Sequence, residues 1–429
     1  MAELPLDGNV VARALRQWVG PATIEGFTRM SGGASKETWS FDAIGADGTR
    51  TELVLRRDTP GRPSDPDVTH REAAAISLAR DAGLPVPELL VMSEGAGWDT
   101  PGMIMRRVPG ETIARRILRD EEYARARGML VRQLGQFAAG LHAIEAPADF
   151  PAPDPLAGLR EQLDSFGRPS EVFELALAEL AASPPPPRPR VLVHGDFRLG
   201  NLVVGPEGLR AILDWELTHA GDPAEDLGWL CVKAWRFGAE APAAGLGSRE
   251  ELLAAYKAAG GADISPDELR WWEILGTLRW GVICMTQAWV HLSGAHRSVE
   301  LAAIGRRVCE QEWDLLVLLK PDAAAQAAAR RPVPTGRAHP SPAPYGRPTA
   351  SELLEAVMEF LTGSVMPATS GQLAFHARVA ANALGIVARE LELGPARPGD
   401  DLADRVAASL AVANPKYFGA DVPRRTDPP

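Results

Sequence analysis

The sequence predicts an α+β fold with a small β-rich lobe over residues 1–107, a mostly helical lobe over residues 108–321 and a helical domain over residues 349–429. Three observations lead to this division. Apolar and β-branched residues alternate in short segments near the N-terminus, as they do in strands with one buried face. From about Tyr123 onward, the apolar residues recur with the period of a helix. Between the second and third parts, residues 322–348 are rich in Ala, Pro, Arg and Gly, which is the composition of a linker.

The β-rich lobe is expected to be a small antiparallel sheet with one helix. The first strands are separated by the sequences SGGASKE and GADGTR, whose glycines favour tight turns. A helix is expected around residues 69–81, closed by Gly83 and the turn Pro85-Val86-Pro87. The expected strands cover residues 27–30, 38–43, 51–56, 89–93 and 102–106.

Helices are expected through most of the remaining chain. The segment 271–292 is strongly apolar despite a few polar residues, and we expect it to form a core helix of the larger lobe. The C-terminal domain starts with a helix cap, Thr349 or Ser351, followed by Glu352 and an apolar stripe. The expected helices cover residues 129–144, 171–183, 271–292, 349–366, 371–393 and 400–413.

Composition and charge exclude several classes of protein. The 429 residues are 45% hydrophobic, which is sufficient for a large core, and the net charge of −11 argues against a general nucleic-acid binder. No apolar run approaches the ~20 residues of a membrane helix, and the N-terminus resembles an amphipathic helix more than a signal peptide. The three cysteines have no CxxC spacing, so neither a disulfide framework nor a zinc site is indicated. A cytoplasmic protein is expected.

One local group of arginines departs from the acidic balance. It has two interpretations: a solvated helix face, or a rim that attracts an anionic substrate. Its members are Arg106, Arg107, Arg115, Arg116 and Arg119.

A polar loop interrupts two short expected strands in the sequence VLVHGDFRLGNLVV, residues 191–204. Asp196 and Asn201 lie five positions apart in this loop, and Asp214 ends the next strand, in ILDWE. A tight turn at Gly205-Pro206-Glu207-Gly208 folds that strand back, so the three side chains are expected to converge. A set of oxygen ligands without cysteine suits Mg²⁺, which binds through one or two protein groups plus phosphate oxygens and water. The alternative is a polar turn in a metal-free fold.

This pattern resembles the aminoglycoside phosphotransferase and choline kinase superfamily, which has a two-lobed protein-kinase-like fold. The shared features are HGDFRLGN, with Gly195 where protein kinases carry Arg, and the downstream segment GDPAEDL over residues 221–227. The resemblance covers roughly residues 20–320 and is closest to the phosphotransferase-like domains associated with acyl-CoA dehydrogenases. The C-terminal helical domain lies outside it and is interpreted as an accessory.

The resemblance implies roles for the polar loop. Asp196 would be the catalytic base that accepts the proton of the substrate hydroxyl, with His194 and Arg198 beside it in the catalytic site. His194 is expected to brace the loop through the backbone more than to transfer a proton. Asn201 and Asp214 would bind Mg²⁺.

Two acidic residues downstream have weaker assignments. Asp226 resembles the buried carboxylate that ties down the catalytic loop, and Asp222 would serve the same region. Helix capping without a further role is the alternative for both.

On the nucleotide side, the resemblance implies that Gly32 and Gly33 approach the phosphates, although a plain hairpin is equally expected there. The lysine that usually holds the α- and β-phosphates is replaced by Arg56, with Glu72 as its expected ion-pair partner. Met105 lies in the expected hinge, residues 103–108, which would hold the purine. A further lysine, Lys36, either compensates for the missing lysine or is solvated.

These features predict an ATP-dependent small-molecule kinase that transfers the γ-phosphate to a hydroxyl group, with ATP or GTP and Mg²⁺. The arginine group and the dehydrogenase-associated relatives favour an anionic acceptor, such as a hydroxyacyl-CoA or hydroxy acid. An aminoglycoside O-phosphotransferase and a kinase-fold binding protein with little catalysis are the alternatives. No nucleic-acid or membrane partner is expected, and the C-terminal domain would support a homodimer or a dehydrogenase partner. Five tryptophans are assigned to the core or the acceptor wall: Trp229, Trp235, Trp271, Trp272 and Trp280.

Overall fold

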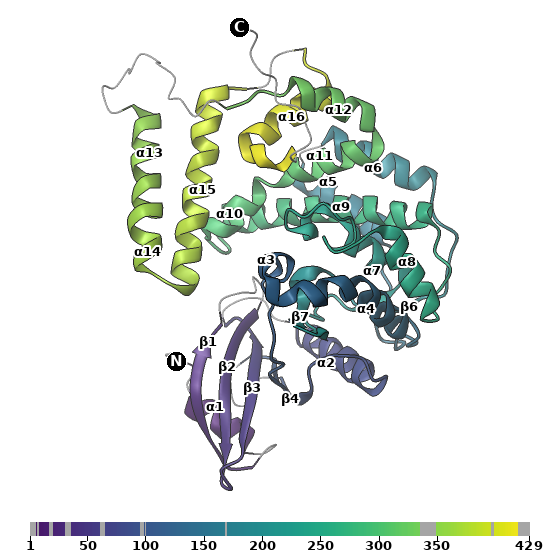
Figure 1. Cartoon of the computed structure of the whole chain (residues 1–429), viewed down its shortest axis with the longest axis vertical. Coiled ribbons are helices and arrows are strands. Elements are labelled where there is room, and N and C mark those ends of the chain that lie inside the picture. The colour runs from purple at the N-terminus through teal and green to yellow at the C-terminus, as the bar shows by residue number, and fades with distance from the viewer. Residues whose placement is uncertain are drawn as a thin grey trace. The chain divides into compact units, whose positions relative to one another are not determined.

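The protein is described by a computed structural model that forms two compact units, Met1–Pro153 with Pro186–Glu273 and Asp154–Pro185 with Ile274–Pro429 (Figure 1). The described residues are 6, 8–16, 20–30, 36–60, 65–94, 98, 100–167, 170–334, 349–395 and 399–418.

The first unit begins with a five-stranded sheet in which every neighbouring pair is antiparallel, in the order β1-β2-β3-β5-β4. The predicted sheet is therefore confirmed, and β4 and β5 have the predicted bounds. The strands are β1 (Ala22–Arg29), β2 (Lys36–Gly45), β3 (Arg50–Asp58), β4 (Leu89–Ser93) and β5 (Gly102–Arg106).

The register of β2 and β3 separates an apolar face of this sheet from a charged one. Trp39 lies opposite Leu55, and this apolar face packs with α1 (Gly8–Leu15) around buried Val11. Lys36 lies opposite Asp58 and Thr38 lies opposite Arg56. Because directly opposed residues share a face, these four side chains lie together on the other face. That face meets α2 (Pro66–Asp81) through the ion pairs described below.

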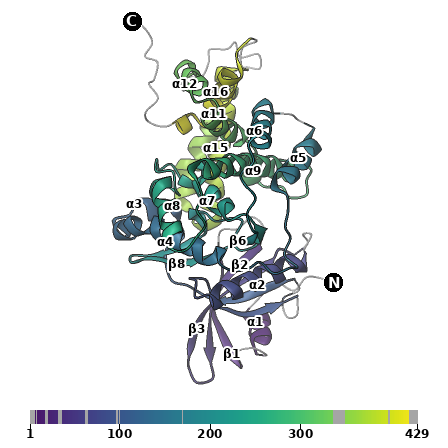
Figure 2. The same cartoon turned by 90° about the vertical axis from the view of Figure 1, so that its right-hand side faces the viewer.

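The rest of the first unit is mostly helical, with two small two-stranded sheets. The helix α4 packs against α8 and against the hairpin strand β8 (Figure 2). Short 3₁₀ turns cover Glu121–Tyr123, Leu199–Asn201 and Lys233–Arg236. The other elements are α3 (Ala114–Arg119), α4 (Ala124–His142), β6 (Val191–Val193), β7 (Leu202–Gly205), β8 (Gly208–Ile212), β9 (His219–Gly221), α7 (Pro223–Cys231), α8 (Arg249–Ala258) and the start of α9 (Pro266–Leu292).

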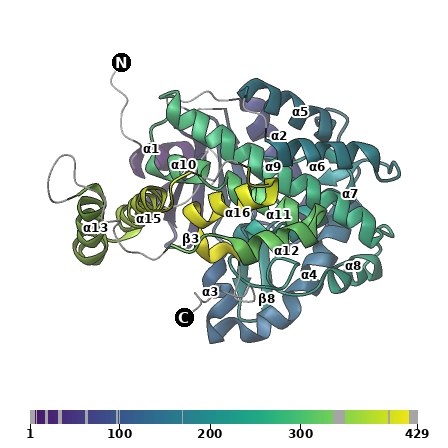
Figure 3. The same cartoon turned by 90° about the horizontal axis from the view of Figure 1, so that it is seen from above.

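Where the second unit is described, its regular elements are all helical. Figure 3 looks nearly along α13 and α15 and shows them side by side. A π-helical turn, Leu361–Val365, connects α13 to α14. The helices are α5 (Pro155–Phe166), α6 (Glu171–Ala182), the remainder of α9, α10 (Val299–Gly305), α11 (Val308–Leu319), α12 (Pro321–Arg330), α13 (Ala350–Phe360), α14 (Met366–Ala368), α15 (Gly371–Leu393), α16 (Leu402–Ala413) and the 3₁₀ turn Pro415–Phe418.

The expected linker over residues 322–348 is only partly compatible with the structure. Its first nine residues belong to α12, whose Ala324, Ala327 and Ala328 are buried. Alanine is the strongest helix former, and Pro321 stands at a helix start, where proline is well tolerated, so the composition favoured a helix over a linker. Residues 335–348 lie outside the described residues. Because α12 packs against both α11 and α16, the compact units do not follow the predicted domain boundaries.

Within the described part of the chain, no helix is both long enough and apolar enough to cross a membrane.

Candidate active site

The polar loop lies between β6 and β7 and ends in the 3₁₀ turn Leu199–Asn201. The hairpin of β7 and β8 then returns the chain to it, and the Leu213 N–H donates to the Asn201 carbonyl at 2.8 Å. Asp214 is the next residue. The predicted convergence of Asn201 and Asp214 therefore follows from one backbone hydrogen bond at the end of the hairpin.

The carboxylate of Asp196 is held by three side-chain donors. Its Oδ1 accepts from the Trp229 indole N–H at 2.8 Å and from Arg198 Nε at 2.9 Å. Its Oδ2 accepts from Asn201 Nδ2 at 2.7 Å. These bonds fix the direction of the carboxylate, and its side chain remains 13% exposed. The sequence did not assign this contact to Trp229; its only signal was the position of the residue three places after Asp226.

Arg198 is fixed at the same time by an aromatic ring. Its guanidinium carbon lies 4.7 Å from the centre of the Trp235 ring, a distance typical of cation–π contact. Arg198 is therefore a neighbour that orients Asp196.

His194 is fully buried and both ring nitrogens bond the backbone. Nδ1 accepts from the Asp196 N–H at 3.1 Å, so the ring hydrogen lies on Nε2, which donates to the Leu213 carbonyl at 3.0 Å. The imidazole thus connects the loop to the end of the hairpin and has no nitrogen left for proton transfer. This geometry agrees with the bracing role and not with proton transfer.

Asp226 is the residue that ties down the loop. Its Oδ2 accepts from the His194 N–H at 2.8 Å and its Oδ1 from the Gly195 N–H at 2.9 Å, while His142 Nε2 lies 3.2 Å from Oδ2. Burial raises the pKa of Asp226, but the hydrogen bond and charge of His142, together with His194, outweigh it and lower the pKa. By contrast, Asp222 caps α7, since its Oδ1 accepts from the Ala224 N–H at 2.8 Å.

Asp214 has a left-handed backbone conformation, with φ of 70°, which Asp tolerates better than most residues. Its Oδ1 accepts from Arg56 Nη2, and the same nitrogen lies 3.2 Å from Glu216 Oε2. Burial raises the pKa of Asp214, but the charge and hydrogen bond of Arg56 lower it overall, with smaller contributions from Arg198 and His194. The carboxylate is therefore ionised at neutral pH.

Asn201 and Asp214 fit a magnesium ion that is held mainly by phosphate and water. The Asn201 amide bonds Asp196 through its nitrogen. A cation would bind the amide oxygen, which takes no part in these two bonds. The Asp214 side chain is 28% exposed. Among the described residues, no cluster of three or more His, Cys, Asp or Glu side chains could enclose a metal. Mg²⁺ needs only one or two carboxylates when substrate phosphates complete its shell, so the donor set suits it.

Arg56 makes the predicted ion pair with Glu72: its Nη1 donates to Glu72 Oε1. The second oxygen of Glu72 accepts from Lys36 Nζ at 2.7 Å. The Lys36 side chain is only 6% exposed, so its interpretation as a solvated lysine is wrong. Burial lowers the pKa of Arg56, but Glu72, Asp214 and Glu216 raise it overall.

Of the other predicted nucleotide contacts, Met105 is buried in β5, opposite Val54 of β3. Gly32 and Gly33 lie outside the described residues.

Acidic neighbours pair with three of the five clustered arginines. Arg106 Nε lies 2.6 Å from Glu88, and Arg107 bonds Glu52. Arg116 bonds Glu111 and Asp120 at 2.5 and 3.1 Å. These pairs neutralise much of the charge that an anionic substrate would meet there.

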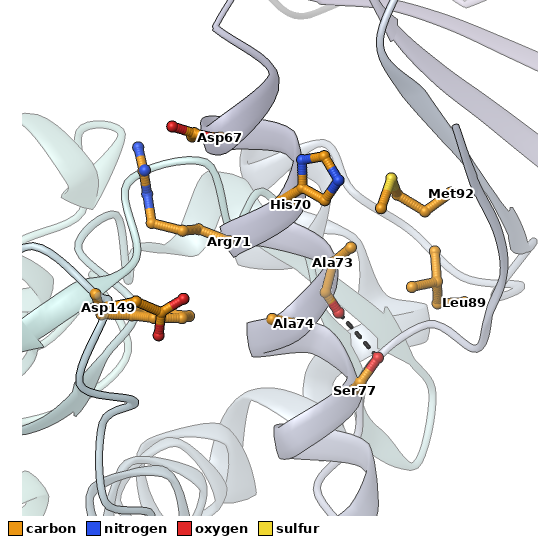
Figure 4. A pocket seen from close by; sticks show the side chains of 10 residues that line it. Asp67, His70, Arg71, Ala73, Ala74, Ser77, Leu89, Met92 and Asp149 are labelled. Carbon is orange, nitrogen blue, oxygen red and sulfur yellow. Dashed lines mark hydrogen bonds between the residues drawn. The ribbon is translucent and has the colours of Figure 1, made fainter. Parts of the chain in front are cut away.

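A cavity of about 560 Å³ lies against α2, and Figure 4 shows His70, Arg71 and Ser77 on the helix side and Asp149 across from them. The Ser77 hydroxyl donates to the Ala73 carbonyl at 2.9 Å. None of the sequence-predicted site residues lines this cavity. Its lining is Asp67, His70, Arg71, Ala73, Ala74, Ser77, Leu89, Met92, Asp149 and Phe150.

Comparison with known proteins gives a family match over more than half of the chain. The model of the phosphotransferase enzyme family matches residues 26–272, which include strands β2 to β5 of the sheet, the polar loop and Asp214. A second family, described as a domain of unknown function, matches residues 367–401 in the C-terminal helices.

Two curated relatives share about a third of their aligned residues with this chain. Mouse acyl-CoA dehydrogenase family member 10 is 30% identical over an alignment of 208 residues, and the match covers 42% of this chain and 18% of the mouse protein. Viomycin phosphotransferase from Streptomyces vinaceus is 30% identical over an alignment of 196 residues, and the match covers 42% of this chain and 62% of the relative. The chain thus spans less than two thirds of either protein.

The fold itself is shared with a solved structure. A Ralstonia eutropha protein assigned as an aminoglycoside phosphotransferase superposes with a TM-score of 0.54 and 20% identity, over 72% of this chain and 98% of that one. This match confirms the predicted kinase-like fold. The family model, which covers more than half of the chain, shows that the chain belongs to the phosphotransferase enzyme family, as the resemblance predicted.

Proposed function

We propose that the protein is an ATP-dependent small-molecule kinase that transfers the γ-phosphoryl group to a hydroxyl of its acceptor. The observation that supports this most directly is the Asp196 carboxylate, which three donors hold in one direction beside Asn201. Enzymes accelerate phosphoryl transfer mainly by positioning the reacting groups and by neutralising the charge of the phosphates. A fixed carboxylate would position the acceptor hydroxyl, and oxygen ligands beside it would hold a cation that neutralises the phosphate charge.

In this proposal, Asp196 accepts the proton of the acceptor hydroxyl as that oxygen attacks the γ-phosphorus, and the bond from the γ-phosphorus to the β–γ bridging oxygen breaks, so that ADP leaves with this oxygen. Arg198 orients the carboxylate, and His194 and Asp226 hold the loop backbone. Asn201 and Asp214 would hold Mg²⁺, which would neutralise part of the negative charge of the nucleotide phosphates.

The nucleotide would lie on the charged face of the sheet. Arg56 and Glu72 belong to this side of the site, and Met105 would contact the purine from the end of β5. Gly32 and Gly33 are proposed for the phosphate-binding loop. ATP is the expected donor and GTP is the alternative.

For the acceptor, we favour a hydroxyacyl-CoA or a related hydroxy acid. Similarity to acyl-CoA dehydrogenase family member 10 supports this class. Similarity to viomycin phosphotransferase supports the second candidate, an aminoglycoside or a related antibiotic.

The test is a panel of hydroxyl-bearing acceptors incubated with Mg²⁺ and ATP or GTP, with detection of the phosphorylated acceptor by mass spectrometry. Hydroxyacyl-CoA thioesters, free hydroxy acids, viomycin and aminoglycosides form its arms. Asp196→Asn is the matched negative control, because it removes the base and preserves shape. Nucleotide binding without turnover on any acceptor would instead favour the kinase-fold binding protein.

The C-terminal helices are proposed as the surface for a protein partner, either a second copy of this chain or an acyl-CoA dehydrogenase. The supporting observation is α13, which has no buried residue and exposes Leu353, Val357 and Phe360 along one stripe. Replacing all three with Ser in the full chain should abolish self-association in sedimentation velocity if the partner is a second copy. Retained self-association would remove this stripe from the interface.

A further inference from the structure

Glu72 has two cationic partners that come from neighbouring strands. Its Oε2 accepts from Lys36 of β2 at 2.7 Å and its Oε1 accepts from Arg56 of β3. Glu72 is 1% exposed, so both cations meet it out of water, where ion pairs are strong and selective. The sequence led us to expect only Arg56 at this carboxylate.

Both terminal nitrogens of the Arg56 guanidinium pair with carboxylates. Nη1 donates to Glu72, and Nη2 donates to Asp214 and lies 3.2 Å from Glu216. A phosphate oxygen that approached Arg56 would have to displace one of these acidic partners. Arg56 is thus placed to connect Glu72 with the carboxylate proposed for the metal.

The Lys36 ammonium makes fewer bonds to acidic side chains than the Arg56 guanidinium does. Its ammonium donates to Glu72 at 2.7 Å and to Thr69 Oγ1 at 3.3 Å, and it lies 3.6 Å from Asp58 Oδ1, beyond hydrogen-bond distance. An ammonium has three N–H donors, so two hydrogen bonds within the described part of the chain leave one donor for a further oxygen.

The position of Lys36 in the chain and in the sheet suits a phosphate contact. It is the first residue of β2 and follows directly on the glycine-containing sequence SGGAS. It shares a sheet face with Arg56, because Lys36 lies opposite Asp58 and Thr38 lies opposite Arg56. In protein kinases, the lysine that pairs with the helix glutamate also holds the nucleotide phosphates. This chain forms a lysine–glutamate pair of that kind, but from β2 and not from β3.

We propose that Lys36, and not Arg56, donates to the phosphate oxygens of the bound nucleotide, while Arg56 holds Asp214. This assignment rests on the proposed nucleotide-dependent function. In this proposal the chain keeps a cation for the phosphates, but Lys36 of β2 supplies it in place of a lysine in β3.

The experiment measures Kd for ADP, ATP and adenosine by isothermal titration calorimetry on the full chain, without metal and then with Mg²⁺. Lys36→Met should weaken ADP and ATP binding about 10- to 100-fold, the range for losing a charged hydrogen bond, and change adenosine binding less than about twofold. Lys36→Gln keeps a donor for Glu72 without the charge and should show the same pattern. The ratio of the Kd values for ADP and adenosine is independent of the folded fraction, so partial unfolding does not imitate the effect.

Two further variants complete the design. Lys257→Met is the matched control, since Lys257 is an exposed α8 lysine paired with Asp263 at 2.8 Å, and it should leave all three Kd values unchanged. Arg56→Met should change the ratio less than Lys36→Met does. If Arg56→Met abolishes the preference for ADP over adenosine and the Lys36 variants retain it, the assignment is overturned. If the parent protein binds no adenine or guanine nucleotide, the proposed function is overturned along with it.

Discussion

Replacing Asp226 with Asn tests how the polar loop is held. Asp226 is 1% exposed, and its two oxygens accept from the N–H groups of His194 and Gly195 at 2.8 and 2.9 Å. Asn keeps the shape but turns one acceptor into an NH₂ group, so one buried backbone N–H faces a donor. The substitution also removes the negative charge of the carboxylate, whose Oδ2 lies 3.2 Å from His142 Nε2.

The magnitude follows from these contacts. A hydrogen bond to a charged group contributes about 1.5–3 kcal/mol, and an unsatisfied buried donor costs about 1–3 kcal/mol. Together with the loss of the buried pair with His142, Asp226→Asn should lower the free energy of unfolding by about 3–5 kcal/mol at neutral pH. Because the loop holds Asp196, phosphoryl transfer should fall as well.

The assay is urea denaturation followed by tryptophan fluorescence, with Asp222→Asn as the matched control. Asp222 caps α7 through the Ala224 N–H, and Asn caps helices as well as Asp does, so this change should cost less than about 0.5 kcal/mol. A loss below about 1 kcal/mol for Asp226→Asn, or an equal loss for both variants, would refute the role of Asp226.

At acid pH, the free energies of unfolding of the parent and of Asp226→Asn should become more similar. The folded-state pKa of Asp226 lies below the ordinary value of about 4 expected in the unfolded chain. The ionised carboxylate therefore stabilises the fold above about pH 4, and this contribution is lost as the pH falls through the lower folded-state pKa. The stability difference should be constant near neutral pH and shrink in acid; a difference that grows below about pH 4 would contradict the assignment.

Three other substitutions have distinct expected outcomes. Asp196→Asn should reduce kcat about 100- to 10,000-fold in the acceptor assay, with an unchanged circular dichroism spectrum, and undiminished turnover would exclude it as the base. Gly195→Ala should destabilise the fold by about 2 kcal/mol or more in urea, because φ is +77° and the new Cβ would lie 2.3 Å from the Leu217 carbonyl oxygen. Arg160→Ala breaks an exposed ion pair with Glu174 at 2.7 Å and should cost less than about 1 kcal/mol; a larger loss would show that this surface pair is more than locally important.

Local patterns in the sequence were sufficient for much of the fold. The alternation of apolar residues located β4 and β5 to the residue, and the helical period located α15 over residues 371–393. The hairpin that returns Asp214 to Asn201 was also predictable, since a turn acts on residues that are adjacent in the chain. The same local logic misjudged α12, where alanine was interpreted as linker composition although it favours helix.

Apart from the pair of Arg56 with Glu72, the distant partners of the buried polar side chains remained undetermined. Arg56 and Asp214 are 158 positions apart, and Trp229 reaches Asp196 across 33 positions. For Lys36, the sequence favoured a solvated lysine over one that compensates for the missing lysine, and its burial became visible only where α2 meets its face of the sheet.

The family was thus predictable from the chain alone, because HGDFRLGN and the following Asp214 form a local motif. The sharing of Glu72 by Lys36 and Arg56, and the bond from Trp229 to Asp196, became visible only in the folded molecule. The physical reason is that strand period and turn chemistry are properties of neighbouring residues. The partner of a buried charge, by contrast, depends on which distant segments exclude water from it.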